Sequence, residues 1–192
     1  MEDLDGWLRC PALDNHQELV FHCRGLQLRG PPPLLPALAH RASSTLRVAT
    51  FDGCRFPDGA DANALRSPVL EKLSLSGVTI SEISLHALLA GCPVLQILIL
   101  STSSGFTRLR LVSPCLRSIG VQVDYWARRS NKLQLVIEDA PCLDMLLLFA
   151  AADNLELDIV VISELSDGFP RLKFDTVEFQ VHLFFTVLSP FA

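Results

Sequence analysis

The fold of this chain is decided by the stretch Ser67-Pro68-Val69-Leu70-Glu71-Lys72-Leu73-Ser74-Leu75-Ser76. It places a small residue and a proline before leucines in the spacing L-x-x-L-x-L. Proline suits a turn just before a strand, because its ring fixes φ and it has no N–H to donate to a ladder. Alternate side chains of a strand point to opposite faces. The stretch therefore predicts a turn, an anchor leucine and a short strand with Leu73 and Leu75 facing the interior.

The same pattern returns along the chain at nearly constant spacing. Copies begin at Leu46, Leu70, Leu95, Leu116 and Leu143, so the leading leucines are 24, 25, 21 and 27 residues apart. Leucine-rich repeats have periods of about 20–29 residues. Four copies follow a small residue and a proline, namely Ser67-Pro68, Cys92-Pro93, Ser113-Pro114 and Ala140-Pro141. Because one such unit cannot bury its apolar face alone, the copies predict stacked coils with a continuous core.

The segments between the predicted strands are of two kinds. Residues 81–90 predict a short amphipathic helix with Ser81 as its N-cap, and residues 36–42 are a second helical candidate. The apolar positions of the first helix are Ile83, Leu85, Leu88 and Leu89. Later crossings alternate leucine with other residues at 109–111, 133–135 and 155–157, which predicts extended returns.

Together these patterns predict an α/β fold, a leucine-rich-repeat solenoid. Its curved parallel sheet has short helical returns early in the chain and extended returns later. We expect a single domain over residues 1–192, with the completeness of the last repeat left open, since the proline cue is missing after residue 157 and residues 169–172 only loosely resemble it. The apolar tail, residues 179–192, lacks the polar cap of a well-ended solenoid, so we expect an abrupt end there.

Charge and hydropathy exclude several classes of partner. The chain has 16 basic and 21 acidic residues and a net charge of −5, whereas nucleic-acid binders carry a basic excess. The N-terminus is acidic and precedes no signal-like apolar run, and the apolar tail is shorter than the roughly 20 residues of a membrane span. We expect no nucleic-acid partner, no membrane and a cytoplasmic or nuclear location. Six basic residues and one acidic residue lie within 108–132, as a solvated face or as a patch for an acidic partner.

Motifs for catalysis and metal binding are missing from the sequence. It has no glycine-rich nucleotide loop, no H-E-x-x-H and no G-x-S-x-G, so we expect no enzyme activity, no catalytic residue and no cofactor. His22-Cys23 is an adjacent pair, for which a packed strand is the simpler interpretation than a catalytic dyad. Cys10, His16, His22 and Cys23 fit no zinc-module spacing, so we expect no metal site.

The six cysteines include no C-x-x-C pair, and we expect free thiols packed in the core. Cys115 and Cys142 occupy equivalent repeat positions. Two stacked buried thiols are the first interpretation, and a regulatory disulfide is the alternative.

The candidate protein-binding residues are outward-facing strand positions, which line one concave surface in such solenoids. They are Lys72, Ser74, Ile97, Ile99, Ser118, Gln122, Met145, Leu147 and Phe149, accompanied by Thr50, Asp52, Ser76 and Ser101. The large apolar members indicate a docking surface, unless another part of the chain covers them. A loop with Tyr125, Trp126, Arg128 and Arg129 is rich in residue types favoured at interfaces, or it is a loop anchored by an inward Trp126.

Residues 88–98, Leu-Leu-Ala-Gly-Cys-Pro-Val-Leu-Gln-Ile-Leu, resemble the "LL-x-x-CP-x-L-x-x-L" segment of plant F-box/leucine-rich-repeat (RNI-like) proteins. Residues 113–117 and 138–143 are similar, and Trp7-Leu8 with Gln17-Glu18-Leu19 resembles the start of that repeat region. The resemblance covers residues 6 to 150. It implies a protein-protein interaction scaffold, the substrate-recognition repeats of an F-box subunit of a cullin-based ubiquitin ligase.

The resemblance also sets a condition on the partners. The F-box of such proteins docks the ligase adaptor, and no F-box is present before Trp7. A ligase adaptor is therefore expected only for a longer form, and the repeats alone imply an unknown protein target. The alternative function is a truncated or non-functional product, or a decoy, with no ligase role.

Overall fold

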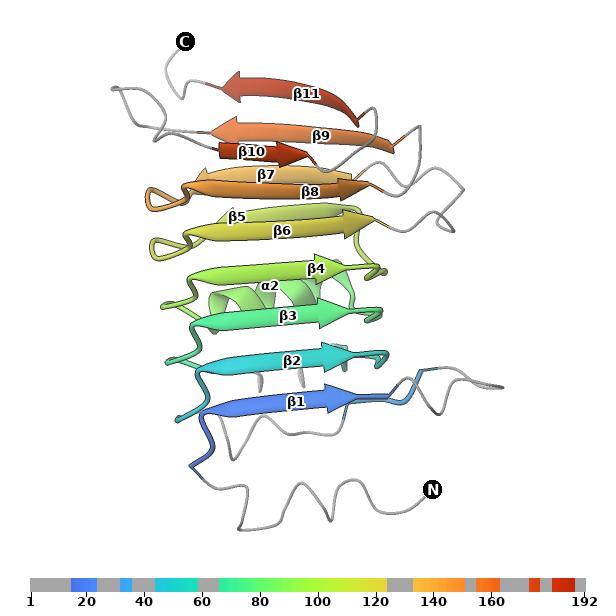
Figure 1. Cartoon of the computed structure of the whole chain (residues 1–192), viewed down its shortest axis with the longest axis vertical. Coiled ribbons are helices and arrows are strands. Elements are labelled where there is room, and N and C mark those ends of the chain that lie inside the picture. Colours follow the sequence, from blue (N-terminus) through green and yellow to red (C-terminus); the bar gives the residue numbers. More distant parts are fainter. Residues whose placement is uncertain are drawn as a thin grey trace.

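Figure 1 shows the fold in a computed structural model of the chain. The structure describes residues 15–23, 32–35, 44–58, 66–123, 133–150, 155–162, 173–176 and 181–188. Of these, residues 123, 148–150 and those from 155 onward are described by their backbone alone.

Seven parallel strands form the first sheet, in the order β1-β2-β3-β4-β6-β8-β10. They are β1 (Glu18–His22), β2 (Val48–Asp52), β3 (Lys72–Ser76), β4 (Ile97–Ser101), β6 (Ser118–Val123), β8 (Met145–Ala150) and β10 (Lys173–Thr176). The register does not shift from coil to coil: Lys72 pairs with Ile97, Ile97 with Ser118, and Ser118 with Met145. The strands β2, β3, β4, β6 and β8 are those that the five leucine-rich copies predict, so the solenoid fold is confirmed.

Two strands of this sheet lie outside those five copies. β1 pairs with β2 through Glu18 and Val48, which places His16 at the position that Leu46 holds in the next coil. The first coil therefore lacks the anchor leucine by which the other copies are recognised. β10 follows the loose copy at residues 169–172 and pairs with β8.

The second sheet contains the extended returns and lies behind the first in Figure 1. Its parallel strands are β5 (Arg108–Val112), β7 (Leu133–Asp139), β9 (Leu155–Ile162) and β11 (Val181–Leu188), in the order β5-β7-β9-β11. The alternating segments 109–111, 133–135 and 155–157 thus form strands, as predicted. Part of the apolar tail is β11, which pairs with β9 along its whole length.

The helix α2 (Glu82–Ala90) is the return between β3 and β4. Ser81 caps it as predicted, because its Oγ accepts a hydrogen bond from the Ser84 backbone N–H at 3.3 Å. The second helical candidate, residues 36–42, lies outside the described residues.

The buried face of α2 differs from the prediction. Ile83 is 78% exposed, whereas Ser84 is fully buried with Leu85 and Leu88. The physical reason is helix geometry: at 3.6 residues per turn Ser84 shares a face with Leu85 and Leu88, and Ile83 lies on the opposite side. The buried hydroxyl is satisfied, because Ser84 Oγ donates to the Pro57 carbonyl oxygen at 3.0 Å.

The core fills the space enclosed by the first sheet, α2 and the second sheet. Inward strand residues such as Leu73, Leu98 and Ile119 are fully buried, and so are Leu109 and Leu135 of the second sheet. All five belong to one cluster of buried apolar residues. Each fully buried leucine stabilises the fold by about 1.5–3 kcal/mol relative to an exposed one. The leucines stacked along the solenoid therefore hold neighbouring coils together.

Candidate protein-binding face

The outward-facing side chains of the seven-stranded sheet form one surface, which we call the open face. In Figure 1, α2 and the second sheet lie behind this sheet, and no described element lies in front of it. In-register pairing aligns these side chains in three rows. The first row is Glu18, Val48, Lys72, Ile97, Ser118 and Met145; the second is Val20, Thr50, Ser74, Ile99, Gly120 and Leu147; the third is His22, Asp52, Ser76, Ser101 and Gln122.

Four large side chains make this face apolar in its middle. We call Ile97 and Ile99 of β4 together with Met145 and Leu147 of β8 the apolar patch. Ile97 and Met145 are each 36% exposed, and Ile99 and Leu147 are half-buried. These four predicted residues therefore lie where the sequence placed them, on two strands that flank β6. Phe149 lies on β8 as well, but its side chain is outside the described part of the chain.

The strand between them contributes small residues. Ser118 of β6 lies between Ile97 and Met145, and Gly120 lies between Ile99 and Leu147. A Cβ added at Gly120 would meet Ile99 Cγ1 at 3.9 Å, an ordinary contact, so packing does not force this glycine. Gly120 leaves the centre of the apolar patch without a side chain. Sequence reasoning missed it, although its place two residues after Ser118 makes it an outward-facing position.

The third row is a polar ladder at the carboxyl ends of the strands. His22 Nδ1 lies 3.1 Å from Asp52 Oδ2, and Ser101 Oγ donates to Gln122 Oε1 at 2.7 Å. Gln122 is exposed, as predicted for a contact residue. Asp52 is only 3% exposed, so its prediction as an outward contact residue is wrong.

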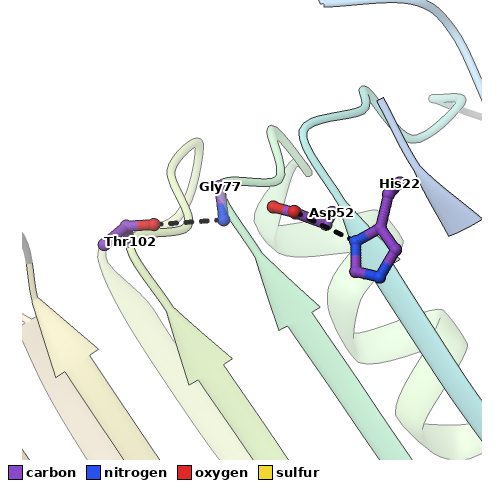
Figure 2. Close-up of polar contacts among 4 residues, drawn as sticks. All are labelled: His22, Asp52, Gly77 and Thr102. Carbon is purple, nitrogen blue, oxygen red and sulfur yellow. Dashed lines mark hydrogen bonds and ion pairs between the residues drawn. The ribbon is translucent and has the colours of Figure 1, made fainter. Parts of the chain in front are cut away.

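The turns that follow the strands explain the burial of Asp52. Figure 2 shows the Asp52 carboxylate between the His22 ring and the turn at Gly77, where an added Cβ would lie 3.7 Å from Asp52 Oδ1. Gly53, Gly77 and Thr102 hold equivalent positions with φ values of 67°, 57° and 49°, and the Gly77 backbone N–H donates to Thr102 Oγ1 at 3.1 Å. The Asp52 carboxylate therefore lies in a space bounded by the His22 ring and the turn at Gly77.

Of the remaining predicted contact residues, two lie in the part of the chain that the structure describes and four do not. Lys72 and Ser74 of β3 are half-buried and lie on the open face beside β4. Tyr125, Trp126, Arg128 and Arg129 lie outside the described residues.

The described members of the basic stretch do not form one patch. Arg108 and Arg110 lie on β5 of the second sheet, and Arg117 directly precedes β6 of the first sheet. Arg110 is paired with Glu138 of β7, and its guanidinium lowers the pKa of that carboxyl.

The buried cysteines are poor candidates for chemistry. Burial, with a smaller effect of Asp52, raises the pKa of Cys23, and burial raises the pKa of Cys54 to about 12 and that of Cys92 to about 11. The thiolate is the nucleophilic form of cysteine, and a raised pKa makes it scarce in these three buried residues. His22 contacts Asp52, so it is not placed as a base for Cys23. Over the described residues, no group of three or more His, Cys, Asp or Glu side chains is placed to hold a metal ion.

Cys115 and Cys142 correct the expectation of stacked buried thiols. Cys115 is only half-buried and Cys142 is exposed. Both follow the proline in the turn that leads into a strand, where side chains lie outside the core. They resemble in this respect Val94 of the preceding coil, which is also exposed.

The stacked parallel coils, the buried L-x-L strands and the open face define the class of this protein, a leucine-rich-repeat solenoid. The family model described as "FBD-associated F-box protein At5g56370, LRR repeats" matches residues 4–176. The chain belongs to this family, which confirms the resemblance to the repeat region of plant F-box/leucine-rich-repeat proteins. Repeats of this class are protein-interaction scaffolds and are generally non-catalytic.

The searches for related curated proteins and for similar solved structures gave no match. Within the described ranges, no helix has the length and apolarity that a membrane crossing requires.

Proposed function

We propose that the open face holds a protein target for a cullin-based ubiquitin ligase. In this function the repeats select the target, and the F-box of a longer form binds the ligase adaptor. Two observations support the proposal. The matching family is described as F-box proteins with leucine-rich repeats, and the described open face carries an apolar patch.

The apolar patch is the single observation that carries the target-binding part. Ile97, Ile99, Met145 and Leu147 lie on the two strands that flank β6. The polar residues beside them are Lys72 and Ser74 of β3, and Ser101 and Gln122 in the third row. An apolar patch with a polar rim is typical of protein interfaces. Gly120 itself is buried, so the side chains of Ile99 and Leu147 on either side of it form the surface that the target would contact.

A charge in the patch tests this placement. We expect Ile99→Asp to reduce the amount of cross-linked target recovered with the tagged chain by about tenfold or more, because desolvating a carboxylate opposes docking. The matched control is Ile83→Asp on α2, which puts the same charge at a 78% exposed position away from the open face. Circular dichroism of both variants checks that the fold is kept.

The loop residues need a parallel test. Charge reversal at Arg128 and Arg129 should also weaken recovery if that loop contributes to the site. If Ile99→Asp and the double reversal both leave recovery unchanged, the target does not bind where we place it.

The ligase role has its own alternative, a truncated or non-functional product, or a decoy that holds targets without their ubiquitination. Mapping the 5′ end of the natural transcript separates these functions. In-frame upstream sequence that encodes an F-box, together with co-precipitation of the ligase adaptor by the encoded protein, is the expected result. A transcript that begins at Met1, with no adaptor recovered, would rule out the ligase role for this product.

We also propose how the protein behaves in solution and where it is located in the cell. A folded binding module should be a soluble monomer with one cooperative thermal transition, whereas a failed product should aggregate or melt without cooperativity. We place the protein in the cytoplasm or nucleus, with no enzyme activity of its own and no cofactor. A fluorescent fusion that accumulates in the secretory pathway would contradict that location.

A further inference from the structure

The turns that lead into β6 and β8 have the same backbone structure. In the first, the Leu116 N–H donates to the Ser113 carbonyl oxygen at 3.3 Å, and in the second, the Leu143 N–H donates to that of Ala140 at 3.0 Å. Each turn has proline as its second residue and cysteine as its third, namely Cys115 and Cys142. The two cysteines therefore occupy the same position of the same kind of turn.

The ladder that follows these turns fixes their register. The Arg117 carbonyl oxygen accepts from the N–H groups of Asp144 and Met145 at 3.0 and 3.1 Å. Ser118 then pairs directly with Met145. Counting back three residues from this pair reaches Cys115 in one coil and Cys142 in the next. The two residues are stacked neighbours.

Stacked neighbours in a parallel ladder lie within reach of a disulfide. Adjacent strands are about 4.8 Å apart, and a disulfide joins residues whose Cα atoms are roughly 4.4–6.8 Å apart. The equivalent positions of the two cysteines in neighbouring turns therefore place their Cα atoms in the range that a disulfide can span.

These two thiols also differ from the other described cysteines in access to solvent. Cys23, Cys54 and Cys92 are buried in the core, whereas Cys142 is exposed and Cys115 is half-buried. A dissolved oxidant can therefore reach Cys142, while the core shields the other three.

We propose that Cys115 and Cys142 are a peroxide-responsive thiol pair that forms a disulfide between two coils of the solenoid. The Cys142 thiolate attacks hydrogen peroxide: an S–O bond forms, the O–O bond breaks, and hydroxide leaves, so that Cys142 becomes a sulfenic acid. The Cys115 thiolate then attacks this sulfur, the S–S bond forms, and the oxygen leaves as water after protonation. The two sulfurs give two electrons to the peroxide, which is the oxidant.

The disulfide restricts the separation of these two coils. It closes the chain from residue 115 to residue 142, which includes β6 and β7, and holds Ser118 beside Met145. The coil of β6 and the coil of β8, which carries Met145 and Leu147 of the apolar patch, then cannot separate. This proposal depends on the fold and not on the identity of a target.

Peptide mapping of the whole chain after treatment with hydrogen peroxide tests the pair. We expect one linked peptide that joins Cys115 to Cys142 with the loss of two hydrogens, loss of two titratable thiols per chain, and a raised thermal midpoint that reverts with dithiothreitol. Cys115→Ser and Cys142→Ser should each abolish the linked peptide.

Two further variants test the register. The chain with Val94→Cys and Cys142→Ser restores a stacked pair one coil earlier, and it should form a disulfide between positions 94 and 115. The chain with Cys115→Ser and Arg117→Cys puts an exposed thiol two residues out of register with Cys142, and it should not. Cys142 oxidised to sulfinic acid beside a reduced Cys115, or equal linkage in the out-of-register variant, would overturn the proposal.

Discussion

The coil between β3 and β4 returns through the helix α2, whereas the coil between β4 and β6 returns through the strand β5. Both returns cover the same core, since Leu85 of α2 and Leu109 of β5 are fully buried. The nine residues of α2 rise about 1.5 Å each and the five of β5 about 3.3 Å each. The two segments are therefore of similar length, and a strand covers the core with fewer residues.

The two returns differ in what happens to their backbone groups. A helix satisfies its own N–H and C=O groups, but β5 is the edge of the second sheet next to α2, and its N–H groups need acceptors. Side chains of α2 supply them: the Arg108 N–H donates to Glu82 Oε2 at 3.1 Å, and the Arg110 N–H donates to His86 Nε2 at 3.0 Å. Two acceptors four residues apart on a helix match two N–H groups two residues apart on a strand, because both spacings are roughly 6–7 Å. A solenoid can thus change from helical to extended returns if the last helix protects the first strand.

The largest loss of stability is expected from a substitution in the turn between β4 and β5. Gly105 has a φ of +97°, and an added Cβ would overlap the Ile80 carbonyl oxygen. We expect Gly105→Ala to lower the free energy of unfolding by about 3 kcal/mol, since it combines backbone strain with a steric clash. Chemical denaturation followed by circular dichroism measures this loss.

The matched control is the turn before α2. Gly77 has a φ of +57°, but its Cβ would make only ordinary contacts, so Gly77→Ala should cost about 1–2 kcal/mol, the strain alone. Equal losses in the two variants would show that the turn to the strand is no more constrained than the turn to the helix.

Removal of the buried hydroxyl of α2 should have an intermediate effect. Ser84→Ala eliminates the part-buried bond from Ser84 Oγ to the Pro57 carbonyl oxygen. We expect a loss of about 1–2 kcal/mol in the free energy of unfolding. Ile83→Ala, at the exposed neighbouring position, should change it by less than about 0.5 kcal/mol. A larger loss for Ile83→Ala would mean that the helix packs through the face that the apolar pattern predicted.

The smallest effect is a pH dependence at the junction of α2 and β5. Burial is the largest effect on His86 and lowers its pKa below the ordinary value of 6.5. The charge of Glu82 opposes this shift, and the charges of Arg110 and Arg108 add to it. The folded protein therefore holds His86 neutral, with Nε2 free to accept the Arg110 N–H. In the unfolded chain the ring takes up a proton first as the pH falls. Stability should therefore decrease below about pH 6.5 and level off below the lowered pKa.

Thermal midpoints between about pH 7.5 and pH 5.5 measure this effect. His86→Gln keeps a neutral acceptor at the same site and should show a smaller decrease over that range. The lowered pKa of Glu138 acts below that range, because its contribution is lost only as the pH falls through the carboxylate region. Identical pH profiles for the two proteins would exclude His86 as the group responsible.

The strands and returns could be predicted because their signals are local. The anchor leucine, the preceding proline and the alternating leucines lie within a few residues of the strand that they indicate. β1 lacks that signal, since His16 replaces the anchor leucine, and its place in the sheet depends on pairing with β2.

The predictions that the structure corrects concern which side chains are buried. Ser84 and Asp52 both contact residues far away in the sequence, Ser84 at Pro57 and Asp52 at His22, and a local pattern does not reveal such contacts. The outward placement of Ile97, Ile99, Met145 and Leu147 was predicted correctly, since alternation along a strand decides it. Gly120 was not predicted, because a search for contact residues looks for side chains.

The central claim is that the open face, and not the helical side, binds the target. Incorporation of a photo-cross-linking phenylalanine derivative at position 99 and, in a separate chain, at position 83 tests it most directly in cells. We expect a discrete cross-linked adduct from position 99 that decreases when Leu147→Asp is added, and none of the same mass from position 83. The same adduct from position 83, with none from position 99, would contradict it.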